Sequence, residues 1–184
     1  SIFIELNATK IQFWNYDFSS STYLLQGGAV SLNTWTHIAV TRSGDTWTLW
    51  QDGSSVHSVT SSHTVGNHSN PVVLGRDEYT GGRYYLTGYL RDARIIVGTA
   101  LYTSTFTVPT QPLTAVTNTK FLSCHKPYIV DDSINDSAIT NNGAVNERFG
   151  PYEYLGYGRS NHGGSVNFDG TGDTLTSAQS SDLT

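Results

Sequence analysis

The sequence predicts an all-β protein, an antiparallel β-sandwich, and three observations support this. Apolar and polar residues alternate at period two in one run after another, as expected for strands with one buried face. Turn-forming Gly, Asn, Asp and Pro separate these runs. The composition is rich in Ser, Thr, Gly and Tyr and lacks Met, and no segment has the apolar spacing of a three-turn helix. The 184 residues could form one large β domain or two small ones.

The first strands are predicted from four alternating runs. They are Ile2–Glu5, Ile11–Trp14, His37–Val40 and Trp47–Trp50. Asp52 and Gly53 follow the last run and form a strong hairpin signal, because Gly tolerates positive φ. Val56 and Val59 mark the return strand.

Further strands are shorter and separated by longer connections. Val72–Leu74 is a short buried run after Pro71, and Tyr84–Val97 is broken at Gly88 into two strands or one strongly bent strand. Pro109 and Pro112 lie in an extended connection between residues 99 and 117. A short strand is expected at Ala138–Thr140, within Asn- and Gly-rich loops.

The segment Gly163–Thr184 has the pattern of a domain's beginning. Ser165–Phe168 alternates, a turn follows at Asp169 and Gly170, and the strand pattern resumes at Leu175. Because unpaired N–H and C=O groups are costly, this segment must pair with an earlier strand of its own chain or with another chain. We therefore expect a main sandwich over residues 1–117, a loop-rich connector over 118–162 and a completing strand segment over 163–184.

Composition excludes several classes of partner. The net charge is −5 and only ten Lys and Arg are scattered along the chain, so no basic surface for nucleic acid is expected. No apolar run approaches the ~20 residues of a membrane-spanning helix, so no membrane insertion is expected. The single cysteine, Cys124, excludes an internal disulfide and is interpreted as a small buried hydrophobe, with an interchain link as the alternative.

Three motifs carry a resemblance to a known family. WTHIAVTR at Trp35–Arg42, with the run to Gly53, resembles the central hairpin of laminin-G-like domains of the concanavalin A-like lectin/glucanase superfamily. Val73–Arg76 and Gly88–Ile95 resemble later strands of that family, in the right order. The resemblance implies a concanavalin A-like jelly-roll sandwich across roughly the first 100 residues.

A narrower resemblance concerns tandem laminin-G-like repeats in structural proteins of aquatic bacteriophages and bacteria. Segments 98–116 and 130–143 resemble the joint between repeats, and Ser165–Asp173 resembles the opening phrase of the next repeat, which stands last here. The resemblance implies a chain out of phase with the usual domain start, with an open sheet edge. We expect head-to-tail assembly with copies of itself or adjacent repeats, by strand exchange through Val166, Phe168 and Leu175, in an extracellular fibre, cell-surface appendage or virion.

Candidate catalytic residues are weak. Related glucanases use a Glu-x-Asp-x-x-Glu strand, because retaining hydrolysis needs two carboxylates at one bond. None of the four glutamates here has a second carboxylate at that spacing, and the histidines lack nucleophile or zinc-ligand spacing. His37 is expected to pack in or beside the sheet. The protein is therefore expected not to be an enzyme.

Binding sites remain candidates. A carbohydrate-binding lectin module is the alternative function, with Tyr79, Tyr84 and Tyr85 as the sugar platform. A tyrosine series at Tyr152, Tyr154 and Tyr157 could form an interface instead.

Asp169 and Asp173 could offer carboxylates to Ca²⁺, although a turn rich in Asp and Gly explains them better, and no other cofactor is expected. Three sequons, at Asn7, Asn67 and Asn135, are candidate glycosylation sites on a secretory route.

Overall fold

The computed structural model describes residues 2–7, 9–15, 23–65, 71–76, 84–126, 128–147, 150–151 and 165–177. All of the regular structure in them is β, every strand pair is antiparallel, and the prediction of an all-β antiparallel protein is confirmed. No helix in these residues has the length and apolar character to cross a membrane. The chain divides into two compact units.

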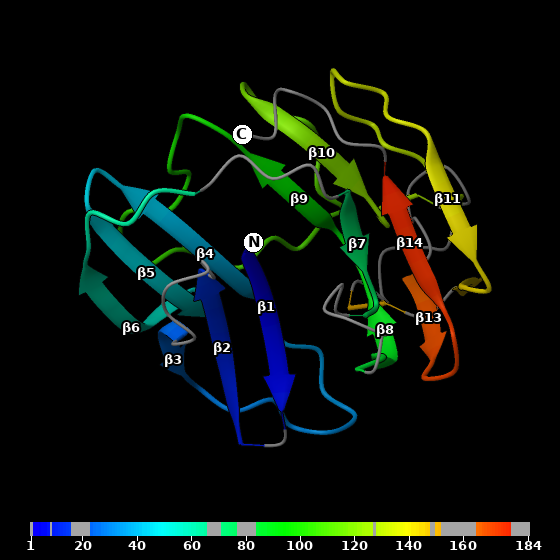
Figure 1. Cartoon of the computed structure of the whole chain (residues 1–184), viewed down its shortest axis with the longest axis horizontal. Coiled ribbons are helices and arrows are strands. Elements are labelled where there is room, and N and C mark those ends of the chain that lie inside the picture. The colour runs from blue at the N-terminus through cyan, green and yellow to red at the C-terminus, as the bar shows by residue number, and fades with distance from the viewer. Residues whose placement is uncertain are drawn as a thin grey trace. The chain divides into compact units, whose positions relative to one another are not determined.

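Unit 1 contains the first six strands and the later segment Gly98–Val108. Its strands are β1 (Ile2–Asn7), β2 (Lys10–Asn15), β3 (Tyr23–Gly27), β4 (Ile38–Ser43), β5 (Thr46–Gln51) and β6 (Ser54–Thr60). They form two three-stranded sheets, in the orders β1-β2-β3 and β4-β5-β6 (Figure 1). The alternating runs predicted in this half of the chain lie in strands, except that His37 directly precedes β4.

The core of unit 1 follows from this alternation. Ile11, Phe13 and Leu25 point to one face of the first sheet and are 5% exposed or less. Trp47 and Leu49 of β5 belong to the same buried cluster, with the rings of Phe13 and Trp47 5.6 Å apart between centroids. Period-two spacing in three strands thus supplies one continuous apolar layer.

The predicted Asp52-Gly53 hairpin turn is confirmed, and it holds the segment Gly98–Val108 in place. Both turn residues have positive φ, 49° and 80°. The Phe106 N–H donates to the Gly53 carbonyl over 3.0 Å, while the Phe106 ring stacks on Tyr102 and meets the edge of Trp50. His37 also packs against these rings, beside the sheet as expected. The segment is therefore an aromatic strap over the hairpin.

Gly53→Ala is expected to lower the free energy of unfolding by about 2 kcal/mol or more. A Cβ at this position would lie 2.1 Å from the Phe106 carbonyl oxygen, in addition to the cost of positive φ. Gly44→Ala is the matched control, because its φ is 59° and a Cβ there meets nothing within 4 Å. Urea unfolding followed by tryptophan fluorescence measures both, and equal losses in the two variants would contradict the strap contact.

The described residues of unit 2 form eight strands, most of them short. They are β7 (Val72–Leu74), β8 (Thr87–Leu90), β9 (Ala93–Ile96), β10 (Thr119–Ser123), β11 (Ile139–Asn142), β12 (Val145–Glu147), β13 (Ser165–Asp169) and β14 (Thr174–Ser177). The sheet orders are β11-β14-β7, β12-β13-β8 and β10-β9. Figure 1 shows the first and the last of these sheets. The stretch Tyr84–Val97 contains two strands, but they are separated at Asp92, which has a φ of 57°, and the predicted break at Gly88 is wrong because Gly88 lies within β8.

The two units do not coincide with the segments 1–117, 118–162 and 163–184 that were expected from the sequence. Strands β10, β11 and β12 lie in the stretch 118–162, which was expected to be a loop-rich connector, and they belong to unit 2. Phe121 and Leu122 of β10 are 2% and 0% exposed. The sequence predicts only β11 among them, as the short strand at Ala138–Thr140. Strands β10 and β12 are stabilised by partners distant in sequence, which local alternation does not reveal.

Candidate functional site

The hairpin formed by β13 and β14, residues 165–177, occupies the centre of two sheets of unit 2. Strand β13 pairs with β8 on one side and β12 on the other, and β14 pairs with β7 and β11. Figure 1 shows β14, in red, between β7 and β11. Within the described residues these four flanking strands have no other ladder partner. The hairpin, which the sequence left open to pairing in its own chain or another, thus completes both sheets within its own chain.

The three residues predicted for strand exchange are core residues of unit 2. Val166, Phe168 and Leu175 are each 1% exposed or less and share one buried cluster with Cys124 and Ala144. The Phe168 ring lies against Gly75, where a Cβ would be 2.1 Å from the ring. The hairpin therefore inserts its apolar side chains into a site shaped for them.

The turn of this hairpin is organised by the two predicted calcium ligands. The Asp169 N–H donates to Asp173 Oδ2 over 2.7 Å, and the Thr171 N–H donates to Asp169 Oδ1 over 2.7 Å. Asp173 is 7% exposed, and Gly143 leaves room for its Oδ1 atom. Among the described residues no group of three His, Cys, Asp or Glu side chains could hold a metal ion. Calcium at this turn remains a prediction.

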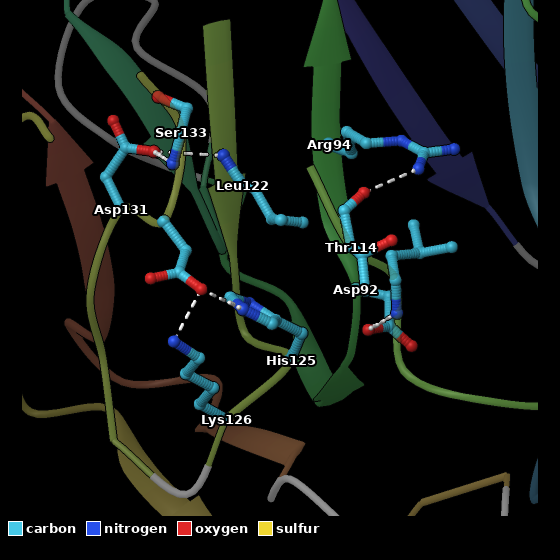
Figure 2. A network of polar contacts seen from close by, with 10 residues as sticks. Asp92, Arg94, Thr114, Leu122, His125, Lys126, Asp131 and Ser133 are labelled. Carbon is cyan, nitrogen blue, oxygen red and sulfur yellow. Dashed lines mark hydrogen bonds and ion pairs between the residues drawn. The ribbon is translucent and has the colours of Figure 1, made fainter. Parts of the chain in front are cut away.

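A buried carboxylate fixes the chain between β10 and β11. Asp131, 3% exposed, accepts hydrogen bonds at Oδ1 from the N–H groups of Leu122 and Ser133, each over 3.0 Å. Its Oδ2 accepts a third from the Ser137 N–H over 3.1 Å. Figure 2 shows Asp131 beside Leu122 and Ser133. One carboxylate thus satisfies one backbone donor of β10 and two of the following loop, which explains how a polar segment packs in unit 2.

The neighbouring carboxylate forms a surface ion pair. Asp132 Oδ2 bonds the Lys126 ammonium and lies 3.1 Å from His125 Nε2. The hydrogen bond from Lys126 is the main cause that holds the pKa of Asp132 below its usual value, and the same bond raises the pKa of Lys126. The pair ties the two ends of the loop 126–132 together.

The Lys126–Asp132 pair is expected to contribute less than about 1 kcal/mol, because the Asp132 side chain is 40% exposed. Since the pKa of Asp132 is lowered on folding and that of Lys126 is raised, the stabilisation is complete between about pH 4 and pH 10. It is lost as the pH falls through the folded pKa of Asp132 or rises through that of Lys126. A double-mutant cycle with Lys126→Met and Asp132→Asn measures the coupling, and an unchanged coupling at pH 2 would contradict this assignment.

Cys124 is a buried core residue, which confirms its interpretation as a small hydrophobe. It is 1% exposed and packs in the cluster that contains Val166 and Phe168. Burial raises the pKa of its thiol to about 12, so the thiolate is scarce at neutral pH. The alternative of an interchain disulfide would require unit 2 to open.

The predicted sugar platform lies partly outside the described residues, since Tyr79 belongs to the stretch 77–83. Tyr84 is 75% exposed, whereas Tyr85 forms a β-bridge with Arg76 and is half-buried. The two neighbouring tyrosines thus differ in exposure, and a shared sugar platform stays a prediction. The interface tyrosines between residues 152 and 157 also lie outside the described part.

The three sequons have different positions. Asn67 lies outside the described residues, and the backbone of Asn7 ends β1. Asn135 is half-buried, and its Nδ2 donates to the Lys120 carbonyl over 3.0 Å. A glycan on Asn135 would have to preserve or replace this bond, and glycosylation stays a prediction at all three.

Sequence reasoning missed two features of the site. Asp131 was not singled out, although a carboxylate followed two residues later by Ser in a polar loop is typical of side-chain-to-backbone turns. Gly75 was noted only as part of a motif. No local signal indicates that its missing side chain makes room for Phe168, because the two are far apart in sequence.

A comparison with protein families gives one match. Residues 1–101, more than half of the chain, match the family model described as the concanavalin A-like lectin/glucanases superfamily, a laminin-G type. No curated protein and no solved structure matches the chain. The match covers the strands of unit 1 together with β7, β8 and β9. The chain therefore belongs to the concanavalin A-like lectin/glucanases superfamily.

Proposed function

We propose that this protein is a non-catalytic structural module of an extracellular assembly, a fibre, appendage or virion, in which neighbouring copies or repeats are joined through the hairpin 165–177. The laminin-G type of its family match supports the non-catalytic, extracellular part, because such domains are generally of that kind. In this proposal the hairpin of one copy enters unit 2 of the next copy and makes there the contacts that it makes in its own chain.

The central position of the hairpin is the observation that carries the proposal. Strands β7, β8, β11 and β12 all precede the hairpin in the chain, and β11 and β12 are nearer to it in sequence. All four strands depend on the hairpin to form their sheets. An element that completes a sheet from its centre and fills the space over Gly75 can be supplied by its own chain or by a second one with identical contacts. Exchange in trans converts this intrachain site into a joint.

Two complementary variants test the joint. A chain ending at residue 164 lacks the hairpin and has an open acceptor site. A full-length chain with Gly75→Val has a hairpin but an obstructed site, because the new side chain occupies the space of the Phe168 ring. We expect the mixture to form a 1:1 complex in size-exclusion chromatography with light scattering.

In the matched control, the Gly75→Val chain that supplies the hairpin is replaced by a chain with both Gly75→Val and Phe168→Asp. This chain should not form the complex with the truncated chain. The unaltered chain should form head-to-tail oligomers whose size rises with concentration. A monomeric unaltered chain together with a mixture that forms no complex would contradict the proposal.

Binding of glycans is the second candidate function, and the exposure of Tyr84 favours it. A tyrosine ring that is 75% exposed beside the Gly- and Tyr-containing stretch 77–83 offers a face on which a sugar can stack. A glycan array of the unaltered chain and of the Tyr79→Ala, Tyr84→Ala and Tyr85→Ala variants tests this role. Tyr128→Ala is the control, since Tyr128 is 55% exposed elsewhere in the fold. Absence of binding by the unaltered chain, or equal binding by all variants, would contradict it.

A further inference from the structure

Strand β1 is an edge strand without the usual protection against pairing. It lies at the end of the order β1-β2-β3, and within the described residues it is paired with β2 alone. An edge strand directs the N–H and C=O groups of alternate residues away from its sheet. Natural edges are commonly blocked by Lys, Pro or a bulge. Over its six residues β1 has a single charge, Glu5, no Pro, and no shift in its register with β2.

The core-facing side of β1 is also exposed. Ile4 pairs with Phe13 and Leu6 pairs with Ile11, and cross-strand partners lie on the same face of a sheet. Phe13 and Ile11 are 5% and 0% exposed, whereas Ile4 and Leu6 are 47% and 42% exposed. Ile2, on the same face, is 46% exposed. The apolar layer of unit 1 therefore continues onto β1, where these three side chains are nearly half exposed.

We propose that β1 pairs with β1 of a second copy of this chain, antiparallel and about a two-fold axis that passes through Ile4. The sequence of the strand determines this register. Directly opposed residues of two antiparallel strands must point to the same face of the sheet. An axis between two residues would oppose even-numbered to odd-numbered positions, and so would set the apolar face of one strand against the other face of its partner. An axis at Glu5 would bring two carboxylates together, and an axis at Phe3 would pair fewer residues of the strand.

An axis at Ile4 satisfies both sheet faces. It places Ile2 opposite Leu6 of the second copy and Ile4 opposite Ile4, so the two apolar stripes form one layer. On the other face it places Phe3 opposite Glu5 of the second copy, which avoids any pair of like charges. The result is a continuous six-stranded sheet, β3-β2-β1 followed by the same strands of the second copy.

This contact closes on itself and is separate from the joint at the hairpin. A two-fold contact uses the same surface on both copies and stops at a dimer. Only a few side chains of unit 1 are buried by it, so the dimer is weak and depends on concentration. It does not rest on the proposed function, since the hairpin 165–177 contributes nothing to it.

Disulfide trapping tests the register. Directly opposed residues of antiparallel strands have Cα atoms ~4.5–5.5 Å apart, within the range that a disulfide spans. We expect Ile4→Cys to give a disulfide-linked dimer under mild oxidation. Ile2→Cys is the matched control, because it is equally exposed on the same face but lies ~14 Å from its counterpart in this register. Cys124 does not interfere, being buried with a pKa of about 12.

The expected result is trapping of Ile4→Cys at least ~10-fold faster than Ile2→Cys, and efficient trapping of Ile2→Cys mixed with Leu6→Cys. Equal rates for the two single variants, or no trapping by Ile4→Cys, would overturn the proposal. Sedimentation of the chain without introduced cysteines provides a second readout. Ile4→Lys should abolish the weak dimer, whereas Val65→Lys, at a residue 37% exposed outside the strands, should preserve it. Because Ile4→Lys leaves any joint through the hairpin 165–177 unchanged, the readout is the difference between the two lysine variants. Equal association of Ile4→Lys and Val65→Lys would also overturn the proposal.

Discussion

Phe168→Ala will destabilise unit 2 by about 3–5 kcal/mol. The Phe168 ring is 0% exposed, lies against Gly75, and faces Gly88 across the strand pair of β13 and β8. Neither glycine has a side chain that could move into the cavity. The loss therefore includes the transfer free energy of the ring and the cost of an unfilled space. Denaturant unfolding of the variant and the unaltered chain measures it.

The control for this prediction is Val145→Ala. Val145 lies on β12, next to β13, but is 56% exposed, so its truncation should cost less than about 0.5 kcal/mol. Phe168→Leu should give an intermediate loss, because it retains part of the buried volume. A loss below about 1 kcal/mol for Phe168→Ala would show that the hairpin does not depend on this ring.

Asp131→Ala is expected to cost about 3–5 kcal/mol, because it leaves three backbone donors without their acceptor. The donors are the N–H groups of Leu122, Ser133 and Ser137. Leu122 is 0% exposed and lies in β10, so water cannot replace the lost acceptor there. Thermal unfolding and hydrogen exchange at these amides would measure the loss.

Asp131→Asn separates the individual bonds. An asparagine keeps one oxygen to accept from Leu122 and Ser133 and loses the bond to Ser137, so about 1–2 kcal/mol should be lost. Asp45→Ala is the control for loss of a carboxylate at the surface, since that side chain is 60% exposed. If Asp131→Ala were no more harmful than Asp45→Ala, the proposed role of Asp131 would be wrong.

Strands with their own local signals could be predicted from the sequence. The alternating runs at Ile11 and Trp47 identify strands and their core-facing side chains, although Gln12, Thr48 and Trp50 between them are buried as well. The Asp52-Gly53 turn has the positive φ that the dipeptide predicts. Laminin-G-like motifs between Trp35 and Ile95 agree with the family match to residues 1–101. In these elements local pattern and tertiary packing favour the same structure.

The remaining elements depend on distant partners. Strand β12 has three residues, and its only ladder partner within the described residues is β13, so no local period could identify it. The role of Gly75 depends on the Phe168 ring, and that of Asp131 on amides up to nine residues away. The sequence indicated that the hairpin must pair, but not which strands it would join. Unsatisfied backbone groups predict that a partner exists, whereas the partner itself is determined by the packed core.

Hydrogen exchange of the chain ending at residue 164, compared with the full chain, tests most directly whether the hairpin 165–177 completes unit 2. We expect amides of β7, β8, β11 and β12 to lose their protection in the shorter chain, because their ladder partners are gone. Amides of β4 and β5, which pair with each other in unit 1, serve as the reference. Unchanged protection at Val73 and Tyr89 in the shorter chain would contradict the account.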